Sequence, residues 1–421
     1  MTVTQLADLL TPVAVEDFLA DGYGCHPVVV RGERERYEGL FPWSRLNSLI
    51  RERHLDWFRP AEEGVVGADA ITLSRHGHIR HSPSVDRTID GEYSIDRTRA
   101  RQLDPVRLNH ELRSGSTLLI RHLDKVHEPL SRLAEGLERD LDEPIMVRAF
   151  ATWKAVQGFG PHCDRYDTLV MQLEGTKQWR LFGPDPLRPL MGDGDHSGMG
   201  DAEPDEELLL EPGDLLYVPQ GWWHEAVTVD TPCLHLTADI YQRSGVDLVD
   251  WVTRSLARHP EFRADLPPES DPAARAAHLE RLRELALAEW DDEVVDRFLA
   301  AGRTEARPQR ATMSLPWGAT RQVLPAGQGL VVRMINPRRL DVERDDRPAS
   351  GGAVVVRTQG QTIRLDPERA DLLRPLLVGG SMSVDELSER DPAVRDTLVD
   401  WLLAGHLAVV DDMDTCEETR P

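Results

Sequence analysis

The sequence contains few cysteines, and none of them is placed to form a familiar motif. Among 421 residues there are four, far apart and without a CxxC pair: Cys25, Cys163, Cys233 and Cys416. A zinc site built from thiolates or a framework of disulfides is therefore not expected. Isolated cysteines of this kind fit a reducing compartment, so we predict a cytoplasmic protein.

Long apolar runs are also missing. No stretch reaches the about eighteen consecutive apolar residues that a membrane span needs. The N-terminal segment MTVTQLADLLTPVAVEDFLADG has acidic residues among its apolar ones, and no basic start precedes an apolar core. It is therefore not predicted to be a signal peptide, and no membrane association is expected.

Basic residues are fewer than acidic ones. Lys and Arg number 49 against 73 Asp and Glu, which gives a formal net charge of −24. Such a surface repels phosphate backbones, and we find no basic patch large enough to offset it, so direct DNA binding is not expected. A basic peptide or protein suits this charge as a partner, although an acidic surface also serves solubility alone.

The length exceeds what one hydrophobic core supports, and the pattern changes along the chain. We predict a first domain over residues 1–243, in which helical spacing up to about residue 60 is followed by short strands between turns. Many short strands favour a barrel or a double-sheet jelly roll. The predicted strands lie within 117–123, 145–153, 167–175, 177–182, 214–219, 224–229 and 233–242. The segment 186–207 is rich in Gly and Asp and is predicted to be a surface loop or lid.

The remainder divides into two further regions. Residues 244–303 show helical spacing, and residues 304–421 combine short extended runs with three helices and a closing strand. Each of these three helices is expected to begin after an N-cap residue: Asp366, Ser383 and Asp391. The order resembles a winged helix. Its last helix has one Arg and two Asp before Trp401, a poor arrangement for binding DNA.

A histidine, an aspartate and a second histidine carry the clearest chemical signal. His162 and Asp164 are two residues apart and point the same way if they lie on a strand. His224 follows a Pro-Gln-Gly-Trp-Trp turn and begins a later strand. Two imidazoles and one carboxylate on one face form the triad typical of non-haem Fe(II) oxygenases, which leaves positions open for a 2-oxo acid and O2.

Lys177 is the next candidate. It comes thirteen residues after Asp164, directly after the turn Glu174-Gly175-Thr176. A hairpin returning there places the ammonium group deep in an apolar barrel, where it needs an anionic partner such as the distal carboxylate of 2-oxoglutarate. Without the surrounding motif, a surface lysine would be the ordinary interpretation.

These residues carry a family resemblance. The sequence resembles the JmjC-type cupin oxygenases, specifically the ribosomal oxygenase branch that hydroxylates protein side chains. The matching motifs are PHCD at 161–164, LVMQLEGTKQWRLF, LEPGDLLYVPQGWWH and HLT at 235–237. The resemblance implies a double-stranded β-helix with Fe(II) at His162, Asp164 and His224, and 2-oxoglutarate held by Lys177. It also implies a helical dimerisation region, hence a homodimer, and a C-terminal winged helix that does not bind DNA.

The sequence departs from this family at two positions. Members often have Asn and Tyr fourteen and twelve residues before the first ligand histidine, and the Tyr hydroxyl assists 2-oxoglutarate. Here Arg148 and Phe150 stand at these positions. Lys177 then contributes more to binding 2-oxoglutarate, or Thr168 substitutes for the missing hydroxyl. Arg148 brings a second cation close to the pocket.

Several other residues have both a functional and a structural interpretation. His235 is either a partner of the metal or co-substrate or a hydrogen-bonded core histidine. The histidines at 76, 78 and 81 form an HxH group without carboxylates, which favours a solvated hairpin. Asp193, Asp195 and His196 fall in the predicted loop. The aromatic residues Tyr166, Trp222 and Trp223 flank the ligands and are expected to pack around them.

The sequence therefore predicts an Fe(II)- and 2-oxoglutarate-dependent hydroxylase that uses O2. The favoured substrate is an amino-acid side chain in a protein or peptide, with Arg or His of a basic ribosomal protein first. One alternative is a tailoring hydroxylase of a small natural product or of a ribosomally made peptide, or a demethylase, on the same scaffold. Another is a non-catalytic binding module that retains the fold.

Overall fold

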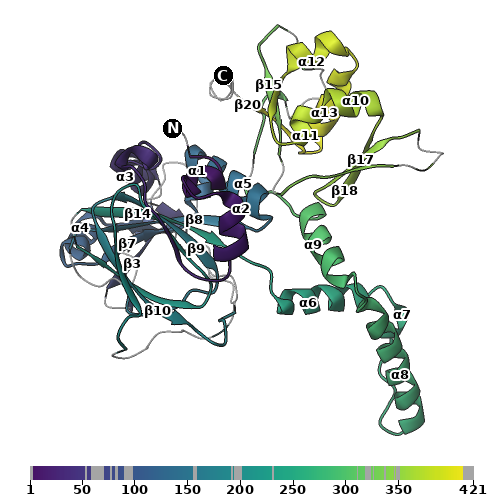
Figure 1. Ribbon diagram of the computed structural model, residues 1–421, viewed down its shortest axis with the longest axis horizontal. Coiled ribbons are helices and arrows are strands. Elements are labelled where there is room, and N and C mark those ends of the chain that lie inside the picture. Colours follow the sequence, from purple (N-terminus) through teal and green to yellow (C-terminus); the bar gives the residue numbers. More distant parts are fainter. Residues whose placement is uncertain are drawn as a thin grey trace. The chain divides into compact units, whose positions relative to one another are not determined.

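The computed structural model separates the chain into two compact units, Met1–Gln242 and Arg243–Pro421 (Figure 1). Each unit is described by itself. The structure describes residues 3–52, 55–57, 71–75, 78–80, 84–89, 98–154, 159–190, 193, 202–229, 232–310, 312–317, 324–325, 327–335, 338–345, 347 and 351–410.

The first unit contains a large antiparallel sheet that faces a small one (Figure 1). The large sheet has eight strands, in the order β1 (Val28–Val30), β12 (Leu215–Val218), β9 (Asp167–Glu174), β14 (Cys233–Ile240), β8 (Ile145–Thr152), β7 (Thr117–Ile120), β3 (Ile71–Arg75) and β4 (His78–Arg80). The small sheet has the order β11 (Glu206–Leu210), β10 (Lys177–Pro184) and β13 (Trp222–Thr228). A further sheet is formed by β2 (Leu55–Trp57), β6 (Thr98–Leu103) and β5 (Ser84–Ile89).

The prediction of a cupin-like barrel of short antiparallel strands is confirmed. The predicted hairpin around residue 76 is also present, since β3 pairs antiparallel with β4. The side chains of its three histidines lie outside the described residues. The segment predicted as a loop over 186–207 ends earlier than expected, because β11 already begins at Glu206 and pairs with β10.

Alternation along the strands gives the large sheet two different faces. Between the two sheets lies an apolar cluster: Val170, Trp179, Leu181, Leu208, Leu210, Leu216 and Val218. The residues between these on β9 and β12, such as Leu169 and Leu215, belong instead to the larger core behind the sheet. Residue identity at alternate positions thus fixes which side chains point into the barrel.

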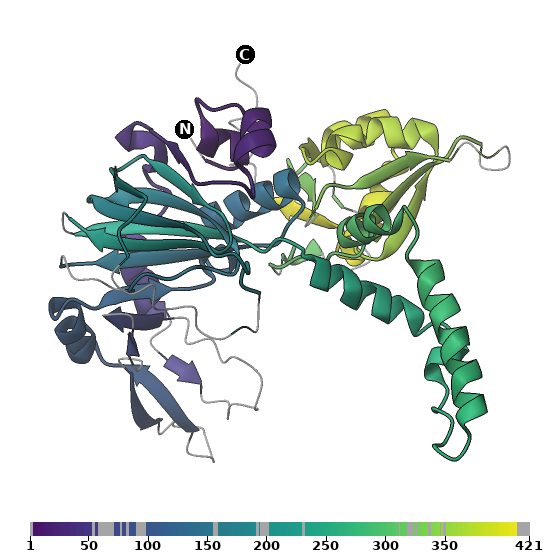
Figure 2. The same cartoon turned by 60° about the horizontal axis from the view of Figure 1, so that its bottom comes forward.

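Helices cover the other face of the large sheet (Figure 2). The helical elements of this unit are α1 (Leu6–Leu10), α2 (Val15–Asp17), η1 (Phe18–Gly22), η2 (Arg34–Tyr37), α3 (Trp43–Glu52), α4 (Pro105–Arg113), η3 (Leu123–Lys125) and α5 (Glu128–Leu141). Helix α5 buries Leu130, Leu133, Ala134 and Leu137, and this three- and four-residue spacing places one apolar stripe against the sheet. Asp140 of α5 accepts a hydrogen bond from the Leu6 amide at 2.8 Å and so fixes the start of α1.

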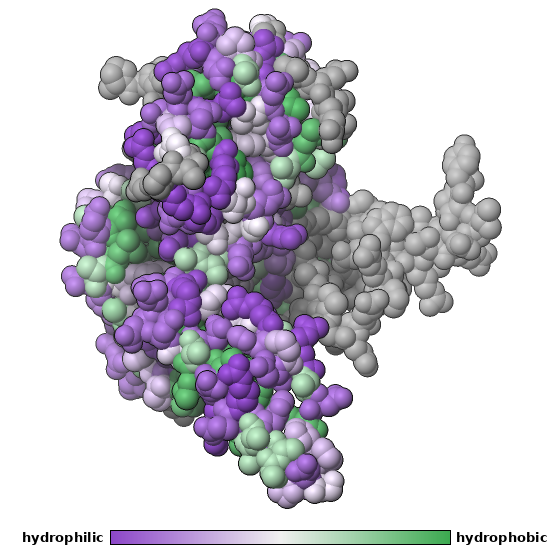
Figure 3. Space-filling view, turned by 90° about the vertical axis from the view of Figure 1, so that its right-hand side faces the viewer, coloured by the Kyte–Doolittle hydropathy of each residue, from purple (hydrophilic) through white to green (hydrophobic). Residues whose placement is uncertain are grey.

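The second unit begins with four helices: α6 (Gly245–Leu256), α7 (Pro260–Arg263), α8 (Pro272–Glu289) and α9 (Val294–Thr304). Helix α8 has 18 residues and none of them is buried. Large apolar side chains are exposed along this region, and apolar patches interrupt the hydrophilic face in Figure 3. Among the described residues, no helix has the length and apolar character needed to cross a bilayer.

The rest of the second unit has its own core, which includes Val332, Leu373, Leu387 and Leu398. Its sheets are β19 (Ser381–Ser383), β15 (Val331–Met334) and β20 (Leu407–Val410), and β16 (Asp341–Arg344), β17 (Val354–Thr358) and β18 (Gln361–Leu365). Its helices are α10 (Pro367–Leu372), α11 (Arg374–Leu377), α12 (Val384–Arg390) and α13 (Val394–Leu403).

Capping follows the prediction for two of the three helices. Asp366 and Ser383 accept from the third backbone amide of α10 and α12. Helix α13 instead has Ala393 at the N-cap position, and Asp391 accepts from the Ala393 amide at 2.9 Å in the preceding turn. The prediction that Asp391 caps this helix directly was therefore wrong, because an extra turn separates the two.

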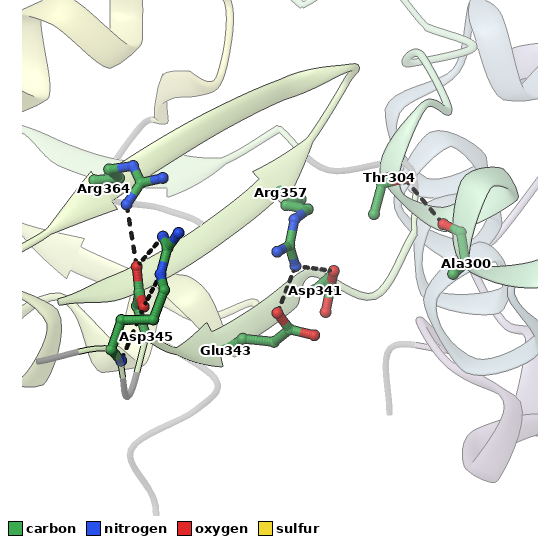
Figure 4. Close-up of polar contacts among 8 residues, drawn as sticks. Ala300, Thr304, Asp341, Glu343, Asp345, Arg357 and Arg364 are labelled. Carbon is green, nitrogen blue, oxygen red and sulfur yellow. Dashed lines mark hydrogen bonds and ion pairs between the residues drawn. The ribbon is translucent and has the colours of Figure 1, made fainter. Parts of the chain in front are cut away.

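Ion pairs lie across β16–β18 (Figure 4). Arg357 on β17 donates to Asp341 at 2.9 Å and to Glu343 at 2.8 Å, while Arg364 on β18 donates to Asp345 at 3.2 Å. Arg357 and Asp341 are directly opposite in the strand register. Exposed pairs of this kind add little stability, so the core and not these charges holds this sheet in place.

The packing of α5 against the N-terminus gives a testable prediction. A Cβ atom on Gly136 would lie 1.8 Å from the backbone oxygen of Thr4, which cannot move like a side-chain end. We expect Gly136→Ala to destabilise the first unit by about 2 kcal/mol through overpacking. Thermal unfolding measures this, with Gly245→Ala as the control because nothing lies within 4 Å of a Cβ there. Equal melting temperatures for the two variants would contradict the packing described.

Candidate metal centre

Three side chains meet at one end of the barrel in the arrangement predicted from the sequence. One ligand atom from each of His162, Asp164 and His224 lies within 4.8 Å of the other two. The His224 Nε2 atom is 3.8 Å from Asp164 Oδ2, and the two imidazole centroids are 4.4 Å apart. Within the described part of the chain, this group includes no fourth His, Cys, Asp or Glu.

Backbone hydrogen bonds bring the two ligand segments together. The amide of His162 donates to the carbonyl of His224 at 3.0 Å, and the amide of His224 donates back at 2.8 Å. Gly221, with φ of +76°, donates to the carbonyl of Asp164 at 2.9 Å. His224 lies in β13, which begins at Trp222, two residues earlier than predicted. His162 and Asp164 do not lie on a strand. They occupy an irregular segment that contacts β13 through a single bridge before β9 begins.

Second hydrogen bonds orient both imidazoles. The Nδ1 atom of His224 is 2.9 Å from the Trp222 carbonyl, and Nδ1 of His162 is 2.8 Å from the Gly160 carbonyl. A carbonyl can only accept, so Nδ1 carries the proton in each ring and Nε2 keeps its lone pair. Metal-binding histidines are normally held in this way.

The charges of the three side chains also suit a metal. Burial and the neighbouring His162 lower the pKa of His224 to about 4, so this imidazole is neutral near pH 7. Burial opposes ionisation of Asp164, but His162, His224 and Arg148 outweigh it and lower the pKa of this carboxyl. Two imidazole nitrogens and one carboxylate, with no further protein ligand among the described residues, fit an Fe(II) ion with open coordination positions.

Asp167 supports this centre and was not identified from the sequence. Its carboxylate accepts from the Gln220 amide at 2.7 Å and from Gln242 Nε2 at 2.6 Å, and it contacts the Tyr217 hydroxyl. Gln220 belongs to the turn that leads to His224. Because Asp167 starts β9, it ties that turn to the large sheet. The only sequence signal was an acidic residue at the first position of a buried strand.

Lys177 lies inside the barrel at the start of β10, with 6 % of its surface exposed. Its Nζ atom is 3.3 Å from Nδ1 of His235, and burial lowers the pKa of the ammonium group. The described residues place no carboxylate in an ion pair with it. A buried ammonium without an anion is strongly disfavoured, so this lysine lies where an anionic ligand would stabilise it.

His235 is 3 % exposed and lies parallel to the Phe150 ring, with centroids 4.8 Å apart. Burial, Lys177 and Arg148 lower its pKa well below the usual value, so the ring is neutral. Since Lys177 can only donate, Nδ1 of His235 accepts and Nε2 carries the proton. His235 is therefore both a hydrogen-bonded core residue and a neighbour of the predicted co-substrate residue.

Thr168 is buried, but the structure places it apart from Lys177. It is opposite Asp239 in the register of β9 and β14, whereas His235, four residues back along β14, contacts Lys177. That Thr168 substitutes for the missing tyrosine hydroxyl in holding 2-oxoglutarate stays a prediction.

The remaining candidates have structural roles or lie outside the described residues. Tyr166 hydrogen-bonds Asp164, and Trp223 donates to Asp185 at 3.2 Å. Trp222 packs on the apolar cluster between the sheets. Asp193 accepts from the Leu190 amide at 2.7 Å, while Asp195 and His196 are outside the described residues.

The chain is similar to known proteins in sequence. Residues 122–248 match the family described as JmjC domain. The chain is 31 % identical over 240 residues to the bifunctional lysine-specific demethylase and histidyl-hydroxylase NO66 of Drosophila persimilis, covering 56 % of this chain and 32 % of that protein. It is 36 % identical over 299 residues to ribosomal oxygenase 1 of Rattus norvegicus, covering 66 % and 46 %. The chain thus spans about a third to a half of these two relatives.

Solved structures show the same fold over nearly the whole chain. The Escherichia coli ycfD structure has a TM-score of 0.57 at 18 % identity and covers 94 % of this chain and 98 % of its own. A structure described as the ribosomal oxygenase YcfD in complex with cobalt and 2-oxoglutarate has a TM-score of 0.55 at 19 % identity, covering 95 % and 99 %.

The triad predicts specific metal binding. We expect the full chain to bind Mn(II), a redox-stable substitute for Fe(II), at one site, and His224→Ala to lose at least about tenfold in affinity because an imidazole ligand is removed. Titration calorimetry measures this. His110→Ala, which removes an exposed histidine of α4, serves as the control. Unchanged Mn(II) affinity in the His224 variant would place the metal elsewhere.

Proposed function

We propose that this chain, whose residues 122–248 form a JmjC domain, is an Fe(II)- and 2-oxoglutarate-dependent oxygenase that hydroxylates an amino-acid side chain. The observation that carries the proposal is the pairing of two features in one barrel. A triad of two imidazoles and one carboxylate leaves metal positions open, and a buried lysine lies in the same interior without a carboxylate ion pair in the described residues.

His162, Asp164 and His224 would hold the iron, which when bound activates O2 against a C–H bond using the electrons of the 2-oxo acid. The chain supplies orientation through the carbonyls of Gly160 and Trp222. Lys177 would pair with the distal carboxylate of 2-oxoglutarate, and His235 would donate to the same group through Nε2–H. Apolar residues such as Trp179 exclude water from this interior.

A protein substrate is favoured over a small molecule. The names of the relatives include histidyl-hydroxylase and ribosomal oxygenase, and the acidic charge of −24 suits a basic ribosomal protein whose Arg or His side chain enters the site. Demethylation is the second candidate, because the Drosophila relative also carries lysine-specific demethylase in its name.

The second unit is proposed to serve assembly and substrate contact. The helical region 244–303 would pair with its copy in a second chain to form a homodimer. This is supported by α8, which buries none of its residues within the chain, and by the exposed apolar side chains Val246, Val249, Leu279, Leu287 and Val295. The region 304–421 is proposed to be a winged helix that contacts protein and not DNA.

Turnover tests the proposed activity. With Fe(II), O2 and ribosomal-protein fragments, we expect 2-oxoglutarate to be converted to succinate and the fragment to gain one oxygen atom by mass spectrometry. His224→Ala should abolish both. Lys177→Ala should raise the 2-oxoglutarate concentration at half-maximal rate by about tenfold or more, since a charged hydrogen bond is lost.

Lys125→Ala, which removes an exposed lysine of η3, is the control for the Lys177 variant. Wild-type kinetics after Lys177→Ala would remove this lysine from the co-substrate site. Succinate formation stimulated only by small amino acids would favour a tailoring enzyme. A protein that binds iron without turning over 2-oxoglutarate with any substrate would point to a binding module.

The proposed dimer has its own test. Sedimentation of the full chain should give the mass of two copies, and Leu279→Asp with Leu287→Asp should shift it to one, because charges on α8 oppose burial of that surface. Val106→Asp, at an exposed apolar residue of α4 in the first unit, is the matched control. A monomeric wild-type chain would overturn the proposal.

A further inference from the structure

The interior of the barrel is divided into an apolar half and a charged half. Strands β9, β10, β11 and β12 contribute the apolar side chains described above. On β14, by contrast, His235, Thr237 and Asp239 occupy alternate positions of a strand that is buried throughout. On β8 the residues facing the barrel are Arg148 and Phe150, since their neighbours Val147, Ala149 and Ala151 belong to the core behind the sheet.

Arg148 is an unusual residue for this interior. Only 8 % of its surface is exposed, and its Nη2 atom donates to Asp239 Oδ1 at 2.6 Å. This is the single hydrogen bond that the described residues give to the guanidinium group, and both Nε of Arg148 and Oδ2 of Asp239 are buried without a partner. A guanidinium offers five N–H donors, so most of its capacity is left for a ligand.

Arg148 lies in the barrel interior close to the candidate metal centre. Its guanidinium lies 5.1 Å from the centre of the Tyr166 ring, and the hydroxyl of Tyr166 hydrogen-bonds the ligand Asp164. The same guanidinium lies 5.4 Å from the Phe150 ring, whose other neighbour is His235. Successive contacts in the barrel interior thus connect Arg148, Phe150, His235 and Lys177.

The register gives the offset along the large sheet between Arg148 and His235, the residue that contacts Lys177. Arg148 is opposite Thr237, and Phe150 is opposite His235, which contacts Lys177. Two residues along a strand correspond to about 7 Å. A five-carbon dicarboxylate has its two charged ends separated by a comparable length, with one end at the metal.

We propose that Arg148 is a second anchor for the co-substrate, pairing with the carboxylate at the metal end of 2-oxoglutarate while Lys177 pairs with the distal one. The inference rests on the proposed function and deepens it. Asp239 holds the guanidinium in place, and the two cations together select a 2-oxo acid that is charged at both ends. This assigns a role to the residue that replaces the neutral amide expected from the family.

Binding of two ligands that differ by one carboxylate tests this assignment. The full chain is loaded with Mn(II), and affinities for 2-oxoglutarate and for 2-oxopentanoate, which lacks the distal carboxylate, are followed by water-proton relaxation of the bound Mn(II). This readout resolves weak binding and requires no turnover. Arg148→Gln should weaken both ligands by the same factor of about ten, whereas Lys177→Ala should weaken 2-oxoglutarate alone.

Two further variants keep the result interpretable. Arg148→Gln leaves Asp239 as a buried charge without a partner, so the pair Arg148→Gln with Asp239→Asn restores neutrality and should fold while binding both ligands as weakly. Arg180→Gln, which removes an exposed arginine of β10 paired with Glu207, should bind as wild type.

The inference is overturned if 2-oxopentanoate binds the neutral pair variant as tightly as the wild type. It is also overturned if the variants lose Mn(II) affinity and keep 2-oxo acid affinity, because Arg148 would then act through Asp164 alone. A wild-type chain that binds Mn(II) but neither 2-oxo acid would instead defeat the proposed function itself.

Discussion

The two backbone hydrogen bonds between His162 and His224 are the constraint on which the metal centre depends. They join an irregular segment before β9 to the beginning of β13, and the two histidines are 62 positions apart in the sequence. Because each residue both donates and accepts, the two segments have one register, and the Nε2 atoms converge beside Asp164. The carbonyls of Gly160 and Trp222 then fix the rings, so that main chain and not side-chain packing sets the geometry.

This arrangement explains how a barrel interior tolerates so many polar groups. Burial penalises the charges of Lys177, Arg148 and Asp239, and only Arg148 and Asp239 offset each other directly. The apolar half of the interior supplies the packing that keeps the barrel closed. The polar groups of the charged half are therefore available to a ligand, and a small dianion can accept hydrogen bonds from their remaining donors.

Much of this was accessible from the sequence, for identifiable reasons. Strand segments such as 167–175 and 233–242 were predictable because turn residues flank short runs rich in β-forming residues. The three metal ligands were predictable from their side-chain chemistry and their order in the sequence. The ion pair of Arg148 and Asp239 was not, since it depends on which residues of β8 and β14 are diagonal neighbours in the register. The placement of His162 and Asp164 on a strand was wrong, because spacing alone does not distinguish a strand from an extended segment held by one bridge.

Gln242 is the last residue of the first unit, and its side chain donates to Asp167, which also holds the turn before His224. The hydrogen bonds that support the metal centre therefore extend beyond the strands of the barrel to Gln242. A protease nick or truncation just before residue 242 would spare all three ligands and every strand of the barrel, yet it would remove a donor from the carboxylate beneath the His224 turn. Gln242 is in this sense part of the support of the candidate metal centre.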